Sequence, residues 1–159
     1  MKALLILTTL FILTSCATSS VNSSVMLAKV GKIQIYVSDY DYLSFYDGAL
    51  TTYGTAKPIE FQKAVEKAIE WDKQAKEPNT PKFSKELDSW NQGNITMTFN
   101  YENKNSSIVL CGHFGSALQL LECEVIASST YNEFLEQMRS APQKLKELKE
   151  ASEASKKFK

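Results

Sequence analysis

The chain has 159 residues, a typical length for one domain, and its hydrophobic content of 43% suits a folded core rather than a disordered chain. It contains 18 lysine and arginine residues and 18 aspartate and glutamate residues, so the formal net charge is zero. This balance gives no support for nucleic-acid binding, which requires a basic surface. After residue 15, no stretch is apolar for long enough to cross a bilayer.

The first predicted element is an export signal over residues 1–15. A lysine at position 2 precedes an apolar run over 3–13 that is too short to span a membrane comfortably. An ordinary secretory signal peptide has the same charged start and short apolar segment, and it is the alternative here. The run ends in an aliphatic residue, two small residues and a cysteine: Leu13-Thr14-Ser15-Cys16.

This motif resembles the lipobox of bacterial lipoprotein precursors. The resemblance implies that diacylglycerol is attached to the Cys16 thiol, that a signal peptidase cuts between Ser15 and Cys16, and that the new amino group is acylated, for example with palmitate. A thiol is the side chain nucleophilic enough for the first step. Several acyl chains would form a nearly permanent anchor, because each buried methylene contributes about 0.8 kcal/mol.

The resemblance also implies a location. Ala17, rather than an aspartate, follows the cysteine, which in Gram-negative bacteria is similar to the pattern of lipoproteins sent to the outer membrane. We therefore expect a lipid-anchored protein of the bacterial cell envelope. In a Gram-negative cell it would lie at the outer membrane and face the periplasm.

Three further segments are expected along the chain. The lipidated cysteine and a flexible tether occupy 16–27, because residues 17–24 are small and polar and cannot bury enough surface to become ordered. A single domain is expected over 28–148. Residues 149–159 are charged and have no apolar face, so they predict a frayed helix or a disordered tail.

The first half of the domain combines strands with one helix. Strict alternation of apolar and polar residues predicts a half-buried strand over 28–38. Residues 39–53 are aromatic and rich in turn formers, with a short strand expected over 43–46. Pro58 suits a helix start, and a helix over 58–76 is predicted by apolar residues at helical spacing: Phe61, Ala64, Val65, Ala68, Ile69 and Ala75.

In the second half, the apolar period changes to that of strands. A loop is expected up to Gly93, with one helical turn over 84–90 that Ser84 would cap. Beyond this loop, alternation predicts a three-stranded meander over 94–101, 107–112 and 118–127. In its last strand, alternation separates two carboxylates from three apolar residues: Glu122 and Glu124 against Leu121, Cys123 and Val125.

A second helix is expected to follow the meander. Thr130 and Glu133 have the spacing of a capping box, and the residues beyond them form an apolar stripe. Pro142 is expected to kink or restart this helix. The predicted fold is α+β, with a small antiparallel sheet of four to five strands packed by two helices.

Cys111 and Cys123 are the two cysteines of the predicted domain, and an exported protein is in a compartment that permits disulfides. They fall on consecutive strands of the meander, at distances from the turn that could set them side by side. We predict a cross-strand disulfide, which would contribute roughly 3 kcal/mol in the chain-entropy model. Two reduced cysteines in the core are the alternative.

The single histidine, His113, lies two residues from Cys111, so in a strand both face the same side. A Cys-His nucleophilic pair, or a metal site that also uses Cys123, is conceivable from this spacing. A zinc site requires a fourth ligand, and a Cys-His pair requires an orienting acid. The sequence singles out neither, and an oxidised cysteine would exclude both, so we predict no catalytic residue, metal or cofactor.

Residues 36–53 are dense in aromatic side chains, with aspartates among them. Tyrosine offers a rigid contact surface with a polar tip, so Tyr40, Tyr42 and Tyr46 are candidates for binding a glycan or a peptide partner. The alternative is that about half of the aromatic rings in this run fill the core under the sheet.

With no catalytic set in view, we expect a non-catalytic envelope protein that binds another macromolecule. Plausible partners are a cell-wall component, an outer-membrane assembly, or a toxin or hydrolase that it inhibits in the manner of an immunity protein. An envelope hydrolase or thiol-dependent enzyme that uses Cys111 and His113 is the alternative. A third possibility is a structural spacer whose charged C-terminal helix pairs with a partner helix.

Overall fold

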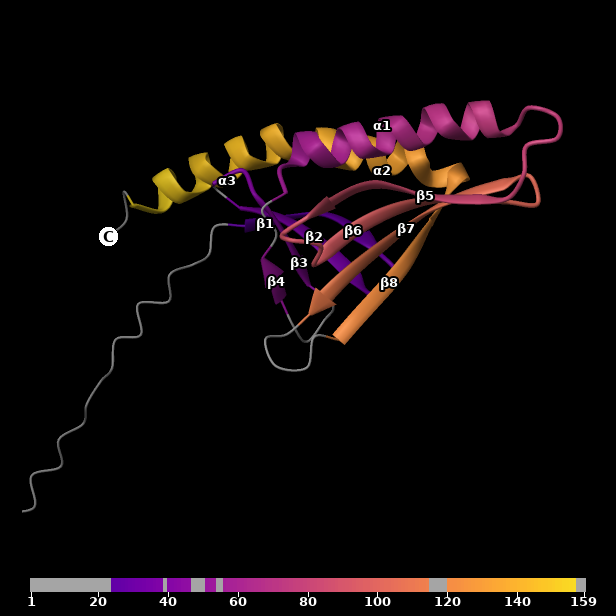
Figure 1. Cartoon of the computed structure of the whole chain (residues 1–159). Coiled ribbons are helices and arrows are strands. Elements are labelled where there is room, and N and C mark those ends of the chain that lie inside the picture. The colour runs from indigo at the N-terminus through magenta and orange to yellow at the C-terminus, as the bar shows by residue number, and fades with distance from the viewer. Residues whose placement is uncertain (1–23, 39, 47–50, 54–55, 115–119, 157–159) are drawn as a thin grey trace, which may run out of the picture.

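The computed structural model describes residues 24–38, 40–46, 51–53, 56–114 and 120–156. In this part of the chain, two antiparallel sheets of four strands each are covered along one side by helices (Figure 1). The expected α+β fold is confirmed, although the strands divide between two sheets instead of forming one. The predicted export signal and Cys16 lie outside the described residues.

The first sheet contains the strands β1 (Ser24–Val30), β2 (Ile33–Ser38), β3 (Leu43–Tyr46) and β4 (Thr51–Tyr53), paired in that order. The short strand predicted over 43–46 is confirmed as β3.

The strand predicted over 28–38 is instead a hairpin of β1 and β2. Gly31 lies in its turn with φ of 54°, a left-handed conformation that favours glycine. Alternation continues on both sides of this turn, which is why the sequence pattern did not separate the two strands. Residues 24–27, assigned above to the tether, belong to β1.

The helix α1 (Pro58–Ala75) confirms the prediction made from apolar spacing. Its start is stabilised by Glu60, whose carboxylate accepts a hydrogen bond of 2.9 Å from the backbone N–H of Lys57. Its buried face joins the two sheets. The ring of Phe61 lies 5.4 Å from that of Phe45 on β3 and 4.2 Å from that of Trp90 in the second sheet.

The second sheet contains β5 (Phe83–Trp90), β6 (Ile95–Glu102), β7 (Asn105–Phe114) and β8 (Leu120–Ala127), in that order. The predicted meander is confirmed as β6, β7 and β8. The helical turn predicted over 84–90 is wrong, because these residues belong to β5. The register shifts between Glu86 and Asp88, and this bulge spaces the inward-facing Phe83, Leu87 and Trp90 by four and three residues, as a helix would.

The described part of the chain ends in a short 3₁₀ turn, η1 (Ser128–Thr130), and two helices, α2 (Tyr131–Arg139) and α3 (Ala141–Lys156). The predicted restart near Pro142 is confirmed, and helix continues to Lys156, within the segment expected to be a frayed helix or disordered. The capping box at Thr130 is wrong. Its hydroxyl donates a hydrogen bond of 2.9 Å to the Ala127 carbonyl inside the 3₁₀ turn and does not cap the helix.

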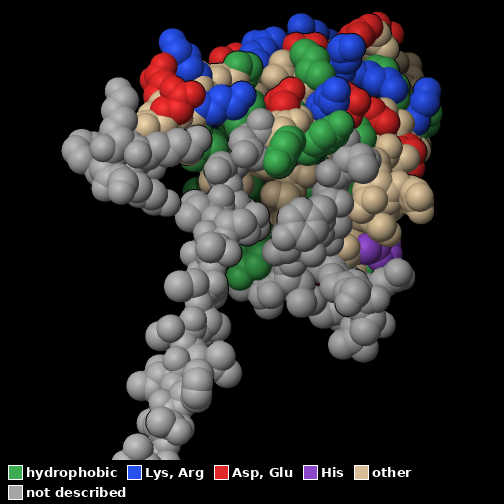
Figure 2. Space-filling view, turned by 90° about the vertical axis from the view of Figure 1, so that its left-hand side faces the viewer, with side chains coloured by type: hydrophobic (Ala, Val, Ile, Leu, Met, Phe, Trp, Pro, Cys, Tyr) green, Lys and Arg blue, Asp and Glu red, His purple; other side chains and the backbone are tan. Residues whose placement is uncertain are grey.

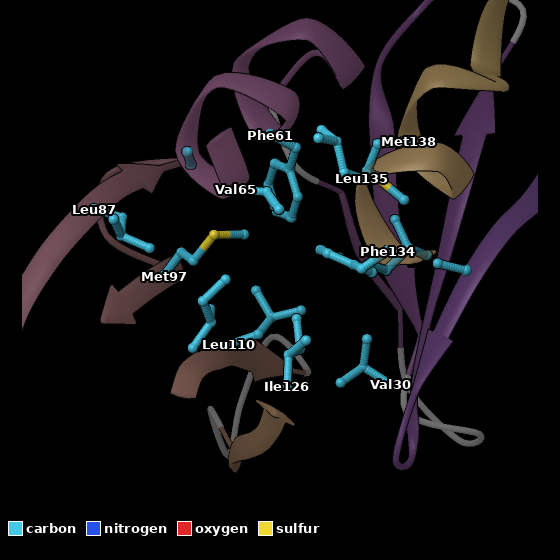
Figure 3. Packing of buried hydrophobic residues seen from close by; sticks show 14 of the residues in the cluster. Val30, Phe61, Val65, Leu87, Met97, Leu110, Ile126, Phe134, Leu135 and Met138 are labelled. Atoms are coloured by element: carbon cyan, nitrogen blue, oxygen red, sulfur yellow. The ribbon is translucent and has the colours of Figure 1, made fainter. Parts of the chain in front are cut away.

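The core lies between the two sheets and the helices α1 and α2 (Figure 3). In this core, each fully buried aliphatic or aromatic side chain contributes about 1.5–3 kcal/mol to the free energy of unfolding, relative to an exposed one. Among the described helices, none is both long enough and apolar enough to cross a membrane. The side chains that meet at the centre of the core include Val30, Phe61, Met97, Leu110, Ile126 and Phe134.

Candidate functional site

The strands β7 and β8 are joined by a disulfide between Cys111 and Cys123. The two residues are direct partners in the register, with their Cα atoms 4.1 Å apart. The predicted cross-strand disulfide is thereby confirmed, and the alternative of two reduced core cysteines is not. Cys111 is half-buried and Cys123 is exposed, so the bond lies on the outer face of the sheet.

The outer face of β8 carries apolar side chains, and its inner face carries carboxylates. Leu121 is 56% exposed and Val125 is 63% exposed, while Glu122 and Glu124 are half-buried. The predicted alternation is therefore correct, but the apolar set faces outward. This is the reverse of the arrangement that burial of apolar surface favours.

Glu124 has a specific partner on the inner side. Its Oε1 atom accepts a hydrogen bond of 2.8 Å from the backbone N–H of Lys32, in the turn between β1 and β2. Ile126, the next inward-facing residue of β8, is buried in the core. The inward carboxylate thus links the second sheet to the first, and this link fixes which residues of β8 remain outside.

The outer face of β7 and β8 also carries no formal charge on its described residues. We call this surface the β7–β8 face. It lies beside the outward-facing threonines of β6. Figure 2 shows one side of the molecule, on which charged side chains gather over the helices. The β7–β8 face consists of Ser107, Val109, Cys111, His113, Leu121, Cys123, Val125 and Ala127.

His113 lies on this face as the spacing predicted, opposite Leu121 in the register. Its backbone N–H donates a hydrogen bond of 2.8 Å to the Asn94 carbonyl, which fixes the end of β7. Cys111 is bonded to Cys123 and so presents no thiolate beside it. Among the described residues, no three His, Cys, Asp or Glu side chains are grouped closely enough to hold a metal ion.

The three candidate tyrosines are not gathered into one cluster. Tyr40 is 79% exposed in the turn between β2 and β3, and Tyr42 is exposed immediately before β3. The Lys57 ammonium lies 5.7 Å from the centre of the Tyr42 ring, at cation–π distance. Tyr46 is half-buried at the far end of β3, while its neighbour Phe45 fills the core. Alternation along β3 thus buries the Phe45 ring, and the three tyrosines stay at least partly exposed.

A buried polar cluster that the sequence did not reveal joins α1, β7 and α2. The Ser106 hydroxyl donates to Asp72 over 2.6 Å and lies 3.3 Å from the Tyr131 hydroxyl. Lys76 pairs with the second Asp72 oxygen over 2.7 Å. Burial is the main cause that raises the pKa of Tyr131 to about 12; the Asp72 charge adds to the effect and the Ser106 hydrogen bond opposes it. Ser106 is buried, and its hydroxyl is held between Asp72 and Tyr131, so we assign the cluster a role in connecting the three elements.

The chain matches no family model, and no curated protein or solved structure is significantly similar to it. The candidate site is therefore defined by its own geometry. Within the described part of the chain, that site is the uncharged β7–β8 face, stiffened by a disulfide and bearing exposed Leu121 and Val125.

Proposed function

We propose that this chain is a lipid-anchored, non-catalytic protein of the bacterial cell envelope that binds another envelope protein through the β7–β8 face. The observation that carries the proposal is the outward position of Leu121 and Val125 on a strand whose carboxylates point inward. The lipobox ending in Cys16 supports the anchor. The Cys111–Cys123 disulfide supports an exported location, because such bonds persist in oxidising compartments.

The energetics of β8 favour a partner. Full burial of a leucine or valine side chain contributes about 1.5–3 kcal/mol, and much of this is not realised while both side chains remain exposed to water. A partner that covers them would recover it. The disulfide between them holds β7 and β8 in register, so little conformational freedom remains to be lost on binding.

The chemistry of the face favours a protein over a cell-wall glycan. A glycan presents many hydroxyl groups, and its recognition uses hydrogen-bonding side chains together with aromatic rings such as those of tyrosine. The β7–β8 face offers aliphatic side chains, a disulfide and small polar residues, with no Asp, Glu, Lys or Arg among its described residues. These suit an apolar patch on another protein, such as a component of an envelope assembly or an enzyme that is inhibited.

The alternative of a thiol-dependent enzyme requires a free Cys111. In the bonded form Cys111 has no thiolate to attack a substrate. Thiol titration of the unreduced protein checks this point: we expect no reactive thiol in the folded domain. A stoichiometric thiol at Cys111 would favour the enzyme.

Affinity capture from envelope extracts tests the binding proposal. The lipidated protein is compared with a Leu121→Lys, Val125→Lys double variant, and with Gln143→Lys on the exposed surface of α3 as a matched control. We expect a partner that is retained by the wild-type protein and the control but lost by the double variant, with all three proteins equally folded. Equal capture of the same partners by all three would contradict the proposal.

A further inference from the structure

The exposed large apolar and aromatic side chains of the described residues fall into two groups. Leu121 and Val125 belong to the β7–β8 face. The other four lie near the point where the chain enters the first sheet: Met26, Tyr40, Tyr42 and Ile59. Single exposed apolar residues are ordinary on protein surfaces, but a group at one place indicates a contact surface.

Hydrogen bonds hold the elements that carry this second group together. Ser24, the first described residue, pairs with Ser38 at the end of β2. The turn that follows is closed by the Ser38 N–H, which donates to the Tyr42 carbonyl over 3.0 Å. The Leu43 N–H then donates to the Ala56 carbonyl over 2.9 Å, just before α1. The starts of β1 and α1 therefore lie on the same side of the molecule (Figure 1).

We infer that this entry surface, made of Met26, Tyr40, Tyr42, Lys57 and Ile59, rests on the lipid bilayer that holds Cys16. The inference rests on the lipid anchor of the proposed function and adds the orientation of the domain. Ser24 follows Cys16 by eight residues. Because an extended chain spans at most ~3.3–3.6 Å per residue, β1 begins no more than about 29 Å from the anchored cysteine. The anchor therefore keeps the side of the domain around Ser24 within this distance of the membrane surface.

The side chains of the entry surface suit the boundary between lipid and water. Tyrosine is enriched there, because its ring enters the apolar region while its hydroxyl stays among the head groups. Ile59 is 50% exposed on the first turn of α1 and can enter the same layer. The Lys57 ammonium, next to the Tyr42 ring, can pair with a lipid phosphate. Figure 2 looks onto this side and shows hydrophobic side chains at its middle, below the charged side chains of the helices.

An environment-sensitive fluorophore on single added cysteines tests the orientation. The native cysteines do not react with the label when Cys16 is lipidated and Cys111 is bonded to Cys123. Labels are placed at Tyr40→Cys and Ile59→Cys, with Gln74→Cys as a matched control on α1. Position 74 is exposed and lies about 22 Å from position 59 along the helix, at 1.5 Å per residue.

The full lipidated protein is bound to vesicles of phosphatidylethanolamine and phosphatidylglycerol, with and without lipids that carry a quencher near the head group. We expect blue-shifted and quenched emission at positions 40 and 59, and neither change at 74. Aqueous emission at all three positions on protein that floats with the vesicles would overturn the inference and leave the anchor intact. Protein that does not float with the vesicles would overturn both. Labels that respond only when envelope proteins are added would show a protein-binding surface, and the inference would be wrong.

Discussion

Glu124 on β8 accepts a hydrogen bond of 2.8 Å from the backbone N–H of Lys32 in the β1–β2 turn. This contact joins residues that are 92 positions apart and links the edge strands of the two sheets. It also gives the inward-facing carboxylate of β8 a donor. Because side chains alternate along a strand, fixing Glu124 inward leaves Cys123 and Val125 outward, as the proposed binding face requires.

Replacement of Gly31 tests this contact. A Cβ atom at Gly31 would collide with the Glu124 carboxylate, and the φ of 54° is itself unfavourable for alanine. Gly93 also has a positive φ, 86°, but an added Cβ would meet nothing there. We expect Gly93→Ala to cost about 1–2 kcal/mol of unfolding free energy from the backbone alone. Gly31→Ala is expected to cost more, because the Glu124 carboxylate must move aside and lose its hydrogen bond from the Lys32 N–H. Equal losses in urea denaturation would show that this hydrogen bond adds nothing measurable to the stability.

The buried Ser106 cluster predicts a difference between adjacent serines. Ser106→Ala removes the hydroxyl between Asp72 and Tyr131 and leaves buried polar groups without their partner, which costs about 1–3 kcal/mol. Ser107 faces outward from the same strand, so Ser107→Ala is expected to change stability by no more than about 0.5 kcal/mol. Thermal unfolding of the two variants measures this contrast. The cluster would lack its connecting role if both variants unfolded like the wild type.

Tyr131 predicts a loss of stability at high pH. Its pKa is raised to about 12 in the folded protein, against about 10 in an unfolded chain. Because the pKa of Tyr131 is higher in the folded protein, its protonated hydroxyl contributes fully to the free energy of unfolding below pH 10. This contribution is lost as the pH rises from 10 to 12. Relative to Tyr131→Phe, the unfolding free energy of the wild type is expected to fall by about 2 kcal/mol over this window. Parallel pH profiles for the two proteins would contradict the burial of the hydroxyl.

The disulfide is expected to contribute a measurable part of the free energy of unfolding. Its cysteines are separated by 12 positions, so replacing both Cys111 and Cys123 with alanine is expected to lower the unfolding free energy by roughly 3 kcal/mol. Reduction of the wild-type protein should lower its urea midpoint similarly, while the double variant should not respond to reductant. A wild-type midpoint that is unaffected by reductant would argue against the bond.

Elements with strong local signals could be predicted from the sequence. The regular spacing of α1 and the alternation of the meander determine those elements locally, and the register of β7 and β8 pairs Cys111 with Cys123. β5 was missed because its bulge at Leu87 imitates helical spacing. The β1–β2 hairpin was missed because only the two residues of its turn, Gly31 and Lys32, separate one alternating segment from the next.

The candidate site could be predicted only in part. Alternation separates the two faces of β8 but does not say which face is covered, since that depends on the distant contact of Glu124 with Lys32. The buried cluster unites Asp72, Ser106 and Tyr131 from three elements, and no local pattern connects them. Exposure of Leu121 and Val125 is likewise a property of tertiary packing.

The proposed lipid anchor depends on Cys16, so replacement of Cys16 by serine should release the protein from the membrane fraction while its domain stays folded. The most direct measurement is mass spectrometry of the N-terminal peptide of the protein purified from bacterial membranes. We predict a peptide that begins at Cys16 and carries diacylglycerol and a further acyl chain. A peptide that still contains residues before Cys16, or that carries Cys16 unmodified, would show that Cys16 is not a lipid anchor.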